Sequence, residues 1–553
     1  MRTNSLGVFI TVFAFTACLS TGGDAGCGRP WSASLCQCDD SSADGGVGNF
    51  AQDVVPRNGG TLRIRIAKEP STLLSMLDSE AVIRFIIDHD ILEALVRVGR
   101  YGNQVEPELA TSWSLSEDRI LYTFHLSPKA KWHDGHPVTS SDVQFTFSRL
   151  LDPDGQAVLR EEFAEVGEVA LVDEHTVTLR LDRPRPDFLF TLSMLPILPA
   201  HVFGRAPLAG HPASRAPVGS GPFRFVRWNP GQSIEIERNS EWRGEPPHLE
   251  RIEYHIMSNN RIAFDLFRRG DIDIVPGLPG TTVGVEKGSR LITYPLPQFE
   301  AWIYNNSKPM FSRPATRLAV GLLIDRKAIR CSILSCRADF VEAPWPLKSA
   351  ASNTLPPLSF DPARAAKLLE KDGWVDRNGD GIRERGGIDF SFSLLLPDTE
   401  RELQRAAAVV QTDLARAGIK MSVVSVGPAT YLSRLNARRF DASVITVPTG
   451  AMFDPWPLFH SRAIGSGENY GAFSDAESDE LLDGLRNSKS PVRRLELMQK
   501  LGLRLRSKHP VTFTFRPHGA ALVRDTVRGV TIRTDWFDER LLWTTGPAKK
   551  EAR

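Results

Sequence analysis

Three features are scarce in this chain of 553 residues: unbalanced charge, cysteine and long apolar runs. Lysine and arginine total 67 and aspartate and glutamate 66, so the formal net charge of +1 supplies no basic field for nucleic acid. The apolar run at residues 6–17 is too short to cross a bilayer. No GxSxG, SxxK or HExxH motif occurs, so the usual signatures of serine and zinc hydrolases are missing. We therefore predict a protein that is not an enzyme, needs no cofactor and has no nucleic-acid partner.

The composition is that of a folded, multidomain protein. Apolar residues make up 41% of the chain and charged residues 24%, which argues against wholesale disorder. A chain of this length exceeds what one hydrophobic core organises, so two or three domains are expected.

The N-terminus has the pattern of an export signal. Arg2 precedes the apolar run, which ends in the letters FTAC. Small residues before a cysteine resemble a lipobox, although Phe15 stands where leucine is usual. We predict a lipoprotein signal peptide at 1–17 and a lipid anchor on Cys18, with an ordinary signal peptide cut nearby as the alternative. Residues 18–58 are rich in Gly, Ser, Asp and Ala and predict a flexible tether.

Export permits disulfide bonds, and the remaining cysteines fall into two groups. Cys331 and Cys336 lie in the body of the chain, and we predict that they form a disulfide. The tether holds an odd number, so one of them has no partner there and the pairing stays open: Cys27, Cys36 and Cys38.

The segment 106–153 carries the densest set of local signals. Residues 120–126 alternate apolar and polar side chains, which predicts a strand with one buried face. A tight turn at Asp134-Gly135 follows. Thr139 and Asp142 then form a capping box, the signature of a helix start.

Two short stretches also invite a metal interpretation. His133, Asp134 and His136 are good ligand types, but three such residues in one turn rarely surround one ion, and we interpret them as holding the turn. Residues 376–381 copy the first half of a calcium loop, yet Gly387 replaces the expected bidentate glutamate, so a plain turn is favoured. We predict no metal site.

Regular elements continue along the chain. A helix is predicted over 81–96. From residue 388 to 447 strands alternate with helices, which indicates a parallel sheet. Thr399 and Glu402 predict a second capping box, at the start of a helix over 400–417.

Taken in order, these segments resemble the family 5 solute-binding proteins of ABC importers, which include oligopeptide-, dipeptide- and nickel-binding proteins. A second signature, PVGSGPF at 217–223, also resembles the family pattern, and its glycines permit a tight chain reversal. The resemblance covers 59–543. The residues that match the first signature are Pro107, Leu109, Ala110, Ser112, Trp113, Tyr122 to Phe124, Trp132 to Gly135, Pro137 to Thr139, Asp142 and Val143.

The resemblance implies a mixed α/β, periplasmic-binding-protein-like II fold of class C, with two lobes plus an extra middle domain. The implied boundaries are 1–17 for the signal peptide, 18–58 for the tether, 59–90, 204–298 and 519–545 for lobe I, 91–203 for the middle domain and 299–518 for lobe III.

The resemblance also implies a function. The protein would be a monomeric, extracytoplasmic (periplasmic) lipoprotein that captures a small solute, peptide-like or other, between its lobes and delivers it to an ABC permease. Membrane attachment would be through the lipid anchor only. A tethered sensor or adaptor without a transport role is the main alternative, and a metal-dependent hydrolase a remote one.

Four residues are candidates for ligand contact. Tyr304 and Asn305 lie on the strand where the family crosses into its last lobe, and a packed core phenol and a buried strand residue are the alternatives. Asp454 and Trp456 match the family's ligand-facing loop, with turn capping and core packing as alternatives.

One departure from the family bears on the ligand. Peptide-binding members resemble one another in an aspartate three residues before the Asp-Pro element, where it pairs with the peptide's amino group. This sequence has Ala451 at that place. An ammonium desolvated without a partner costs several kcal/mol, so we predict a preference for ligands without a free amino terminus.

Overall fold

The computed structural model describes residues 55–545, except 79, 89, 100–103, 186, 278–286, 347–348, 350, 352–354, 450–452, 466, 489 and 534–535. The predicted signal peptide, most of the tether and Ala451 lie outside this described part. The chain divides into two compact units. Unit 1 contains Pro295–His518, and unit 2 contains the described residues of 55–277, 287–294 and 519–545. The finer domain boundaries stay a prediction.

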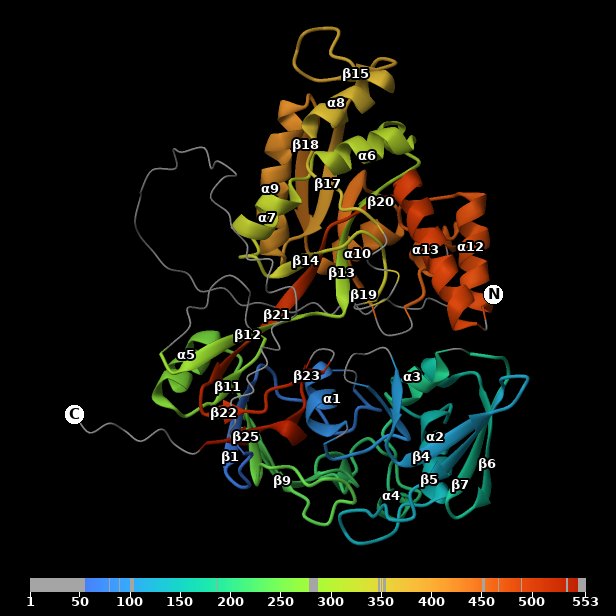
Figure 1. The fold of residues 1–553 in the computed structure, drawn as a ribbon, viewed down its shortest axis with the longest axis vertical. Helices are drawn as coiled ribbons and strands as arrows, with labels where there is room; N and C mark the ends of the chain where they lie inside the picture. The colour runs from blue at the N-terminus through green and yellow to red at the C-terminus, as the bar shows by residue number, and fades with distance from the viewer. Residues whose placement is uncertain are drawn as a thin grey trace, which may run out of the picture. The chain divides into compact units, whose positions relative to one another are not determined.

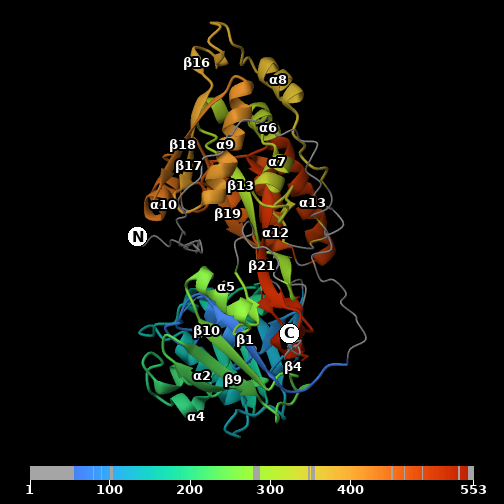
Figure 2. The same ribbon diagram turned by 90° about the vertical axis from the view of Figure 1, so that its left-hand side faces the viewer.

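Unit 2 is built on a large mixed sheet with the strand order β12-β21-β11-β1-β10-β9-β8 (Figures 1 and 2). β1 and β10 run parallel, with Leu62 opposite Ile252. Leu62 and Ile64 are fully buried, because the alternation of the sequence places them on one face. The strands are β1 (Thr61–Ile66), β8 (Phe223–Asn229), β9 (Ser233–Arg238), β10 (Arg251–Ile256), β11 (Ile274–Val275), β12 (Ser289–Pro295) and β21 (Phe515–Arg524).

A second, antiparallel sheet of unit 2 contains the signature segment, in the order β4-β5-β7-β6. Its strands are β4 (Ala110–Leu115), β5 (Leu121–Leu126), β6 (Val166–Asp173) and β7 (Thr176–Leu181). The predicted strand at 120–126 is thus confirmed. So is the capping box, because Thr139 precedes α2 (Ser140–Leu150) and its N–H donates to Asp142 Oδ2 at 2.9 Å.

The predicted helix over 81–96 is wrong in its second half. The helix α1 (Ala81–Ile87) ends nine residues early. The carbonyl of Ile91 accepts the N–H groups of Ser220 and Gly221 at 3.0 and 2.9 Å, and that of Asp90 accepts the N–H of Phe223. These carbonyls therefore accept hydrogen bonds from a distant segment of the chain and not from the next turn of a longer helix.

The other elements of unit 2 are short. They are α3 (Phe188–Leu192), α4 (Ala200–Phe203) and α5 (Asn260–Arg269), and the strand pairs β2 (Val96–Val98) with β3 (Val105–Pro107), β22 (Val527–Arg528) with β25 (Trp543–Thr544), and β23 (Ile532–Arg533) with β24 (Trp536–Phe537).

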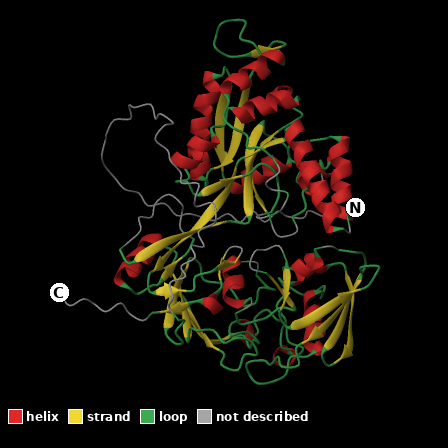
Figure 3. Cartoon of the chain, in the orientation of Figure 1, coloured by secondary structure: helices red, strands yellow, loops and turns green. Residues whose placement is uncertain are grey.

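Unit 1 contains a five-stranded sheet in the order β18-β17-β19-β13-β20, with helices on both of its faces (Figure 3). β17 pairs in parallel with β18 and with β19, which confirms the predicted parallel arrangement, whereas β13 is antiparallel to β19 and β20. Both faces are buried: Trp302 and Tyr304 of β13 pack in one core, and Ala301 and Ile303 in the other. The strands are β13 (Gln298–Tyr304), β17 (Ser391–Pro397), β18 (Lys420–Val426), β19 (Ala442–Pro448) and β20 (Val511–Phe513).

The helices of unit 1 are α6 (Pro314–Leu322), α7 (Arg326–Ser332), α8 (Pro362–Lys371), α9 (Arg401–Arg416), α10 (Pro428–Asn436), α11 (Trp456–Phe459), α12 (Ala476–Asn487) and α13 (Pro491–Lys508). The short strands are β14 (Ala338–Phe340), which pairs with the beginning of β21, and the hairpin of β15 (Glu384–Arg385) and β16 (Ile388–Asp389). The predicted capping box of Thr399 and Glu402 is wrong, because α9 begins one residue later, with Glu400 at the N-cap and no side-chain cap.

Candidate functional site

The two signature segments of unit 2 contact one another through His133. Its Nδ1 accepts the N–H of Gly219 at 3.2 Å, and its Nε2 lies 3.1 Å from the carbonyl oxygen of Gly221. The same carbonyl accepts a hydrogen bond from the side chain of Asn239 at 3.0 Å. One nitrogen accepts and the other donates, which is the pattern of neutral imidazole. Burial lowers the pKa of His133 to about 4, in agreement with that pattern.

The glycines of PVGSGPF allow two backbone segments to pack closely. A Cβ atom on Gly219 would lie 1.8 Å from the carbonyl oxygen of Ile91, and one on Gly221 would lie 2.4 Å from that of Asp90. Neither glycine has a positive φ. Only a residue without a side chain allows the two backbone segments to approach this closely.

The two stretches that were considered as metal sites in the sequence have different structures. Both oxygens of Asp376 accept backbone N–H groups, from Gly379 and Gly381, so this loop is the predicted turn. In the signature turn His133 points to the glycine segment, whereas Asp134 and His136 contact His201 of α4.

Tyr304 and Asn305 are both inside unit 1. The hydroxyl of Tyr304 lies 2.7 Å from that of Thr512, and burial raises the pKa of Tyr304. The amide nitrogen of Asn305 donates to the carbonyl of Phe440 at 3.0 Å, and its oxygen accepts from the hydroxyl of Ser307 at 2.6 Å. Tyr304 is thus placed as the packed phenol given above as an alternative, and Asn305 is buried directly after the end of β13.

Asp454 and Trp456 lie together after β19. One oxygen of Asp454 accepts the N–H of Trp456 at 3.0 Å, and the other lies 2.6 Å from the guanidinium of Arg486. The indole N–H of Trp456 donates to Asp483 at 2.8 Å, and Arg486 lies 4.0 Å above its ring. The negative charge of Asp454 is therefore already compensated within unit 1.

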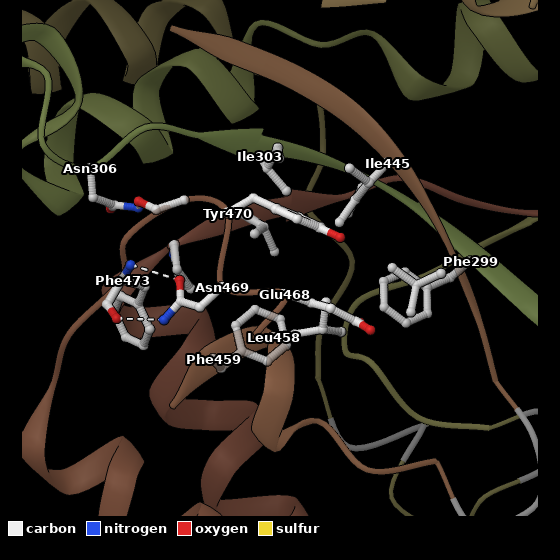
Figure 4. Close-up of a pocket in the computed structure, with 15 residues that line it drawn as sticks. Phe299, Ile303, Asn306, Ile445, Leu458, Phe459, Glu468, Asn469, Tyr470 and Phe473 are labelled. Carbon is white, nitrogen blue, oxygen red and sulfur yellow. Dashed lines mark hydrogen bonds between the residues drawn. The ribbon is translucent and has the colours of Figure 1, made fainter. Parts of the chain in front are cut away.

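A small apolar cavity of about 20 Å³ lies between the strands β13 and β19 and the helix α11 (Figure 4). Glu468, Leu458 and Phe299 are among the residues that line this cavity and are labelled in Figure 4. Asn469 fixes this loop, because its side chain exchanges two hydrogen bonds with the backbone of Phe473, at 2.8 and 2.9 Å. The cavity has room for about one water molecule, so it is too small to hold a solute by itself.

Glu468 supplies the carboxyl group among the residues that line this cavity. Burial raises its pKa to about 7, and no ion pair to Glu468 is present among the described residues. Perturbed carboxyl groups are common at functional sites, although structural positions also produce them. The sequence reasoning missed Glu468, since a single glutamate in a Gly- and Ser-containing loop is indistinguishable from a solvated one.

The cysteines of unit 1 are close together. The sulfur atoms of Cys331, in the last turn of α7, and of Cys336, which follows that helix, lie 4.0 Å apart. Their disulfide stays a prediction, which non-reducing peptide mapping tests: recovery of both residues as free thiols would contradict it. The lipid anchor Cys18 lies outside the described residues.

In the described part of the chain, the backbone passes between the two α/β units at residues 294–295 and 518–519, an arrangement typical of periplasmic-binding-protein-like folds. The model of the bacterial extracellular solute-binding proteins, family 5 (middle), matches residues 104–469, which is more than half of the chain. The chain belongs to this family, and the predicted fold class is confirmed. No helix in the described part of the chain combines the length and apolarity that a membrane span requires.

Individual relatives support this assignment. The chain is 25% identical to the oligopeptide-binding protein AppA of Bacillus subtilis over 486 residues, 86% of this chain and 89% of AppA. The structure of AppA with a nonapeptide matches 89% of this chain and all of that chain, with a TM-score of 0.66 and 24% identity. NikA from Brucella suis, in complex with Fe(III)-EDTA, matches 88% of this chain and all of NikA, with a TM-score of 0.76 and 21% identity. A Brucella ovis protein named as an ABC transporter peptide-binding protein is 26% identical over 452 residues, 81% of this chain and 75% of that protein.

Proposed function

We propose that this protein is an extracytoplasmic lipoprotein that captures a small solute and delivers it to the permease of an ABC importer. Membership of the solute-binding family carries the proposal, and the export signal of the sequence agrees with it. A relative named for an ABC transporter makes a permease the expected partner.

The lipid anchor is the part of the proposal that the N-terminus supports. The apolar run ends in the letters FTAC, with Cys18 as the residue to be modified. Replacement of Cys18 by Ser would then release the protein from membranes and block lipid-linked processing. The mature N-terminus, identified by mass spectrometry, decides: a wild-type chain that begins anywhere except at a lipid-modified Cys18 contradicts the anchor.

The nature of the solute depends on charge compensation. AppA was solved with a nonapeptide, whereas NikA was solved with a metal chelate. This chain has Ala451 where a peptide-binding aspartate is expected, and the neighbouring Asp454 already pairs with Arg486 at 2.6 Å. We therefore propose that the ligand lacks a free amino terminus, because no uncommitted carboxylate stands at that loop position to receive one.

A thermal-shift panel tests this proposal, since a ligand that binds only the folded state raises the melting temperature. Di- to pentapeptides with free amines should give weak shifts or none, and their N-acetylated forms should not be weaker. Mass spectrometry of whatever copurifies with the protein identifies the natural solute. Submicromolar affinity for a peptide, lost on acetylation of its amine, would show that the assignment of the site is wrong.

A further inference from the structure

Unit 2 contains a cluster of two imidazoles and a carboxylate that the solute-binding role does not use. One oxygen of Asp134 lies 3.2 Å from His136 Nδ1, and the other lies 2.7 Å from His201 Nε2. The two imidazole rings are 4.2 Å apart between centroids. One possible ligand atom from each residue lies within 4.8 Å of those of the other two.

These distances are close to those of a tetrahedral metal site. Zinc binds imidazole nitrogen and carboxylate oxygen at about 2.0–2.2 Å, which places neighbouring ligand atoms roughly 3.3 Å apart in a tetrahedron. The two nitrogen–oxygen distances of the cluster, 3.2 and 2.7 Å, lie near this value. The three groups are therefore close enough together for one ion to be placed among them.

The backbone around the cluster is held by a buried carboxylate. Asp142 accepts the N–H of Ala200, at the start of α4, with one oxygen at 2.9 Å. Its other oxygen accepts the N–H of Thr139 at 2.9 Å and the indole N–H of Trp132 at 3.3 Å. The same residue thus fixes both α4, which carries His201, and the turn that carries Asp134. A fixed scaffold of this kind is what a metal site requires from its surroundings.

The cluster is accessible and its charge is suited to a cation. The side chains of His136, Asp134 and His201 are 62%, 32% and 30% exposed. Among the described residues, the ion-pair partners of Asp134 are these two histidines, so no lysine or arginine competes with a metal ion there. Three protein ligands leave a fourth position open to water or to an anion.

We propose that Asp134, His136 and His201 bind a divalent ion of the zinc type and thereby join the signature turn to α4. The sequence alone suggested His133 as the third ligand, in a turn too tight for one ion. The fold instead supplies His201, which lies 67 residues after Asp134, and His133 is directed to the glycine segment.

Calorimetric titration of the EDTA-treated, untagged mature protein with zinc chloride tests the proposal. The tether cysteines are also possible zinc ligands, so the number of ions bound is the decisive quantity. His136→Ala and His201→Ala should each lower the number of ions bound by one, or weaken that site at least ~10-fold. Cobalt(II) in place of zinc should give the wild-type protein a component of tetrahedral visible absorption that both variants lack, beyond any contribution of the tether cysteines.

A matched control is available in the same unit. His255 lies 3.2 Å from Glu253 without a second imidazole among its ion-pair partners in the described structure, so His255→Ala should leave zinc binding unchanged. His136 is mostly exposed, so its replacement reports on metal binding even if His201→Ala loosens α4. If the wild-type protein and both variants bind the same number of zinc ions with the same affinity, the cluster is only a hydrogen-bonded contact and the proposal is overturned.

Discussion

A histidine in the signature region of unit 2 and a glutamate in the segment between α11 and α12 of unit 1 have opposite polar environments. His133 is neutral, buried and hydrogen-bonded on both ring nitrogens to the glycine segment. Glu468 lies at an apolar cavity without an ion pair in the described structure, and its pKa is raised to about 7. A satisfied buried group stabilises a fold, whereas an uncompensated carboxyl group costs stability. His133, a residue of the family signature, therefore has a structural role, whereas Glu468 lies outside the signatures and has no compensating charge in the described structure.

Glycine substitutions should give the largest contrast between the units. In unit 2, Gly219→Ala places a Cβ atom 1.8 Å from the backbone oxygen of Ile91, and should lower the free energy of unfolding by about 3 kcal/mol or more. In unit 1, the nearest atom to a Cβ on Gly484 of α12 is 3.5 Å away, so Gly484→Ala should raise stability by up to about 1 kcal/mol through helix propensity. Calorimetric melting of both variants measures the difference. A Gly219→Ala protein as stable as the wild type would show that the packing of the signatures is not tight.

Acid should reveal the buried histidine of the signature. The folded-state pKa of His133 is about 4 and the ordinary value is 6.5, because burial disfavours the charged ring. The unfolded chain therefore binds a proton first as the pH falls. The stability due to neutral His133 is complete above pH 6.5 and is lost between about 6.5 and 4, by roughly 3 kcal/mol.

The same experiment extends to unit 1. Burial, together with the charges of Arg506, Arg317 and Arg326, lowers the pKa of His509 to about 3. Denaturant titrations between pH 7 and pH 4 measure the loss of unfolding free energy on acidification. His133→Gln and His509→Asn should each make this loss smaller than in the wild type. If the free energy of unfolding falls with pH equally steeply in the wild type and in both variants, the assignment of these two imidazoles as neutral is contradicted.

Much of the fold was predictable, because its signals are local. The alternation at 120–126 and the spacing of Thr139 and Asp142 depend only on neighbouring residues, and the structure contains both elements. The helix predicted over 81–96 failed, since the backbone carbonyls of Asp90 and Ile91 bind a segment some 130 residues later in the sequence. A local pattern carries no information about such a partner.

The site was less predictable for the same reason. Tyr304 and Asn305 have chemistry suited to a ligand, but their partners, Thr512 and Phe440, come from distant strands and loops. The pairing of Asp454 with Arg486 likewise connects a loop to a helix 32 residues away. Only the folded chain shows which polar groups are already occupied.

Removal of the charge at Glu468 should have a moderate effect that depends on pH. Its carboxyl pKa is raised from 4.5 to about 7 by burial, so the cost of ionising it in the folded state develops as the pH rises from 4.5 through 7. Glu468→Gln should stabilise unit 1 at pH 8 by about 1–2 kcal/mol, less than the full shift because the group is partly exposed, and should have little effect at pH 5.

The exposed Glu477, which lies 2.6 Å from Arg504, is the matched control for this glutamate. Glu477→Gln should change stability by less than about 1 kcal/mol at either pH. If Glu468→Gln destabilises the protein at pH 8, the carboxylate has a stabilising partner. Glu468 would then be a satisfied polar group, as His133 is.

The smallest effect concerns the two threonines for which the sequence predicts the same cap. Thr139 donates its N–H to Asp142 at 2.9 Å, and its hydroxyl lies 3.3 Å from the same oxygen, at the start of α2. Thr399 is exposed and precedes the N-cap Glu400, so it caps nothing. Thr139→Ala should therefore cost about 1 kcal/mol and Thr399→Ala less than about 0.5 kcal/mol, as measured by urea denaturation. Equal losses would mean that the hydroxyl of Thr139 does not contribute to the cap, and that the stability of the signature helix comes from Asp142 alone.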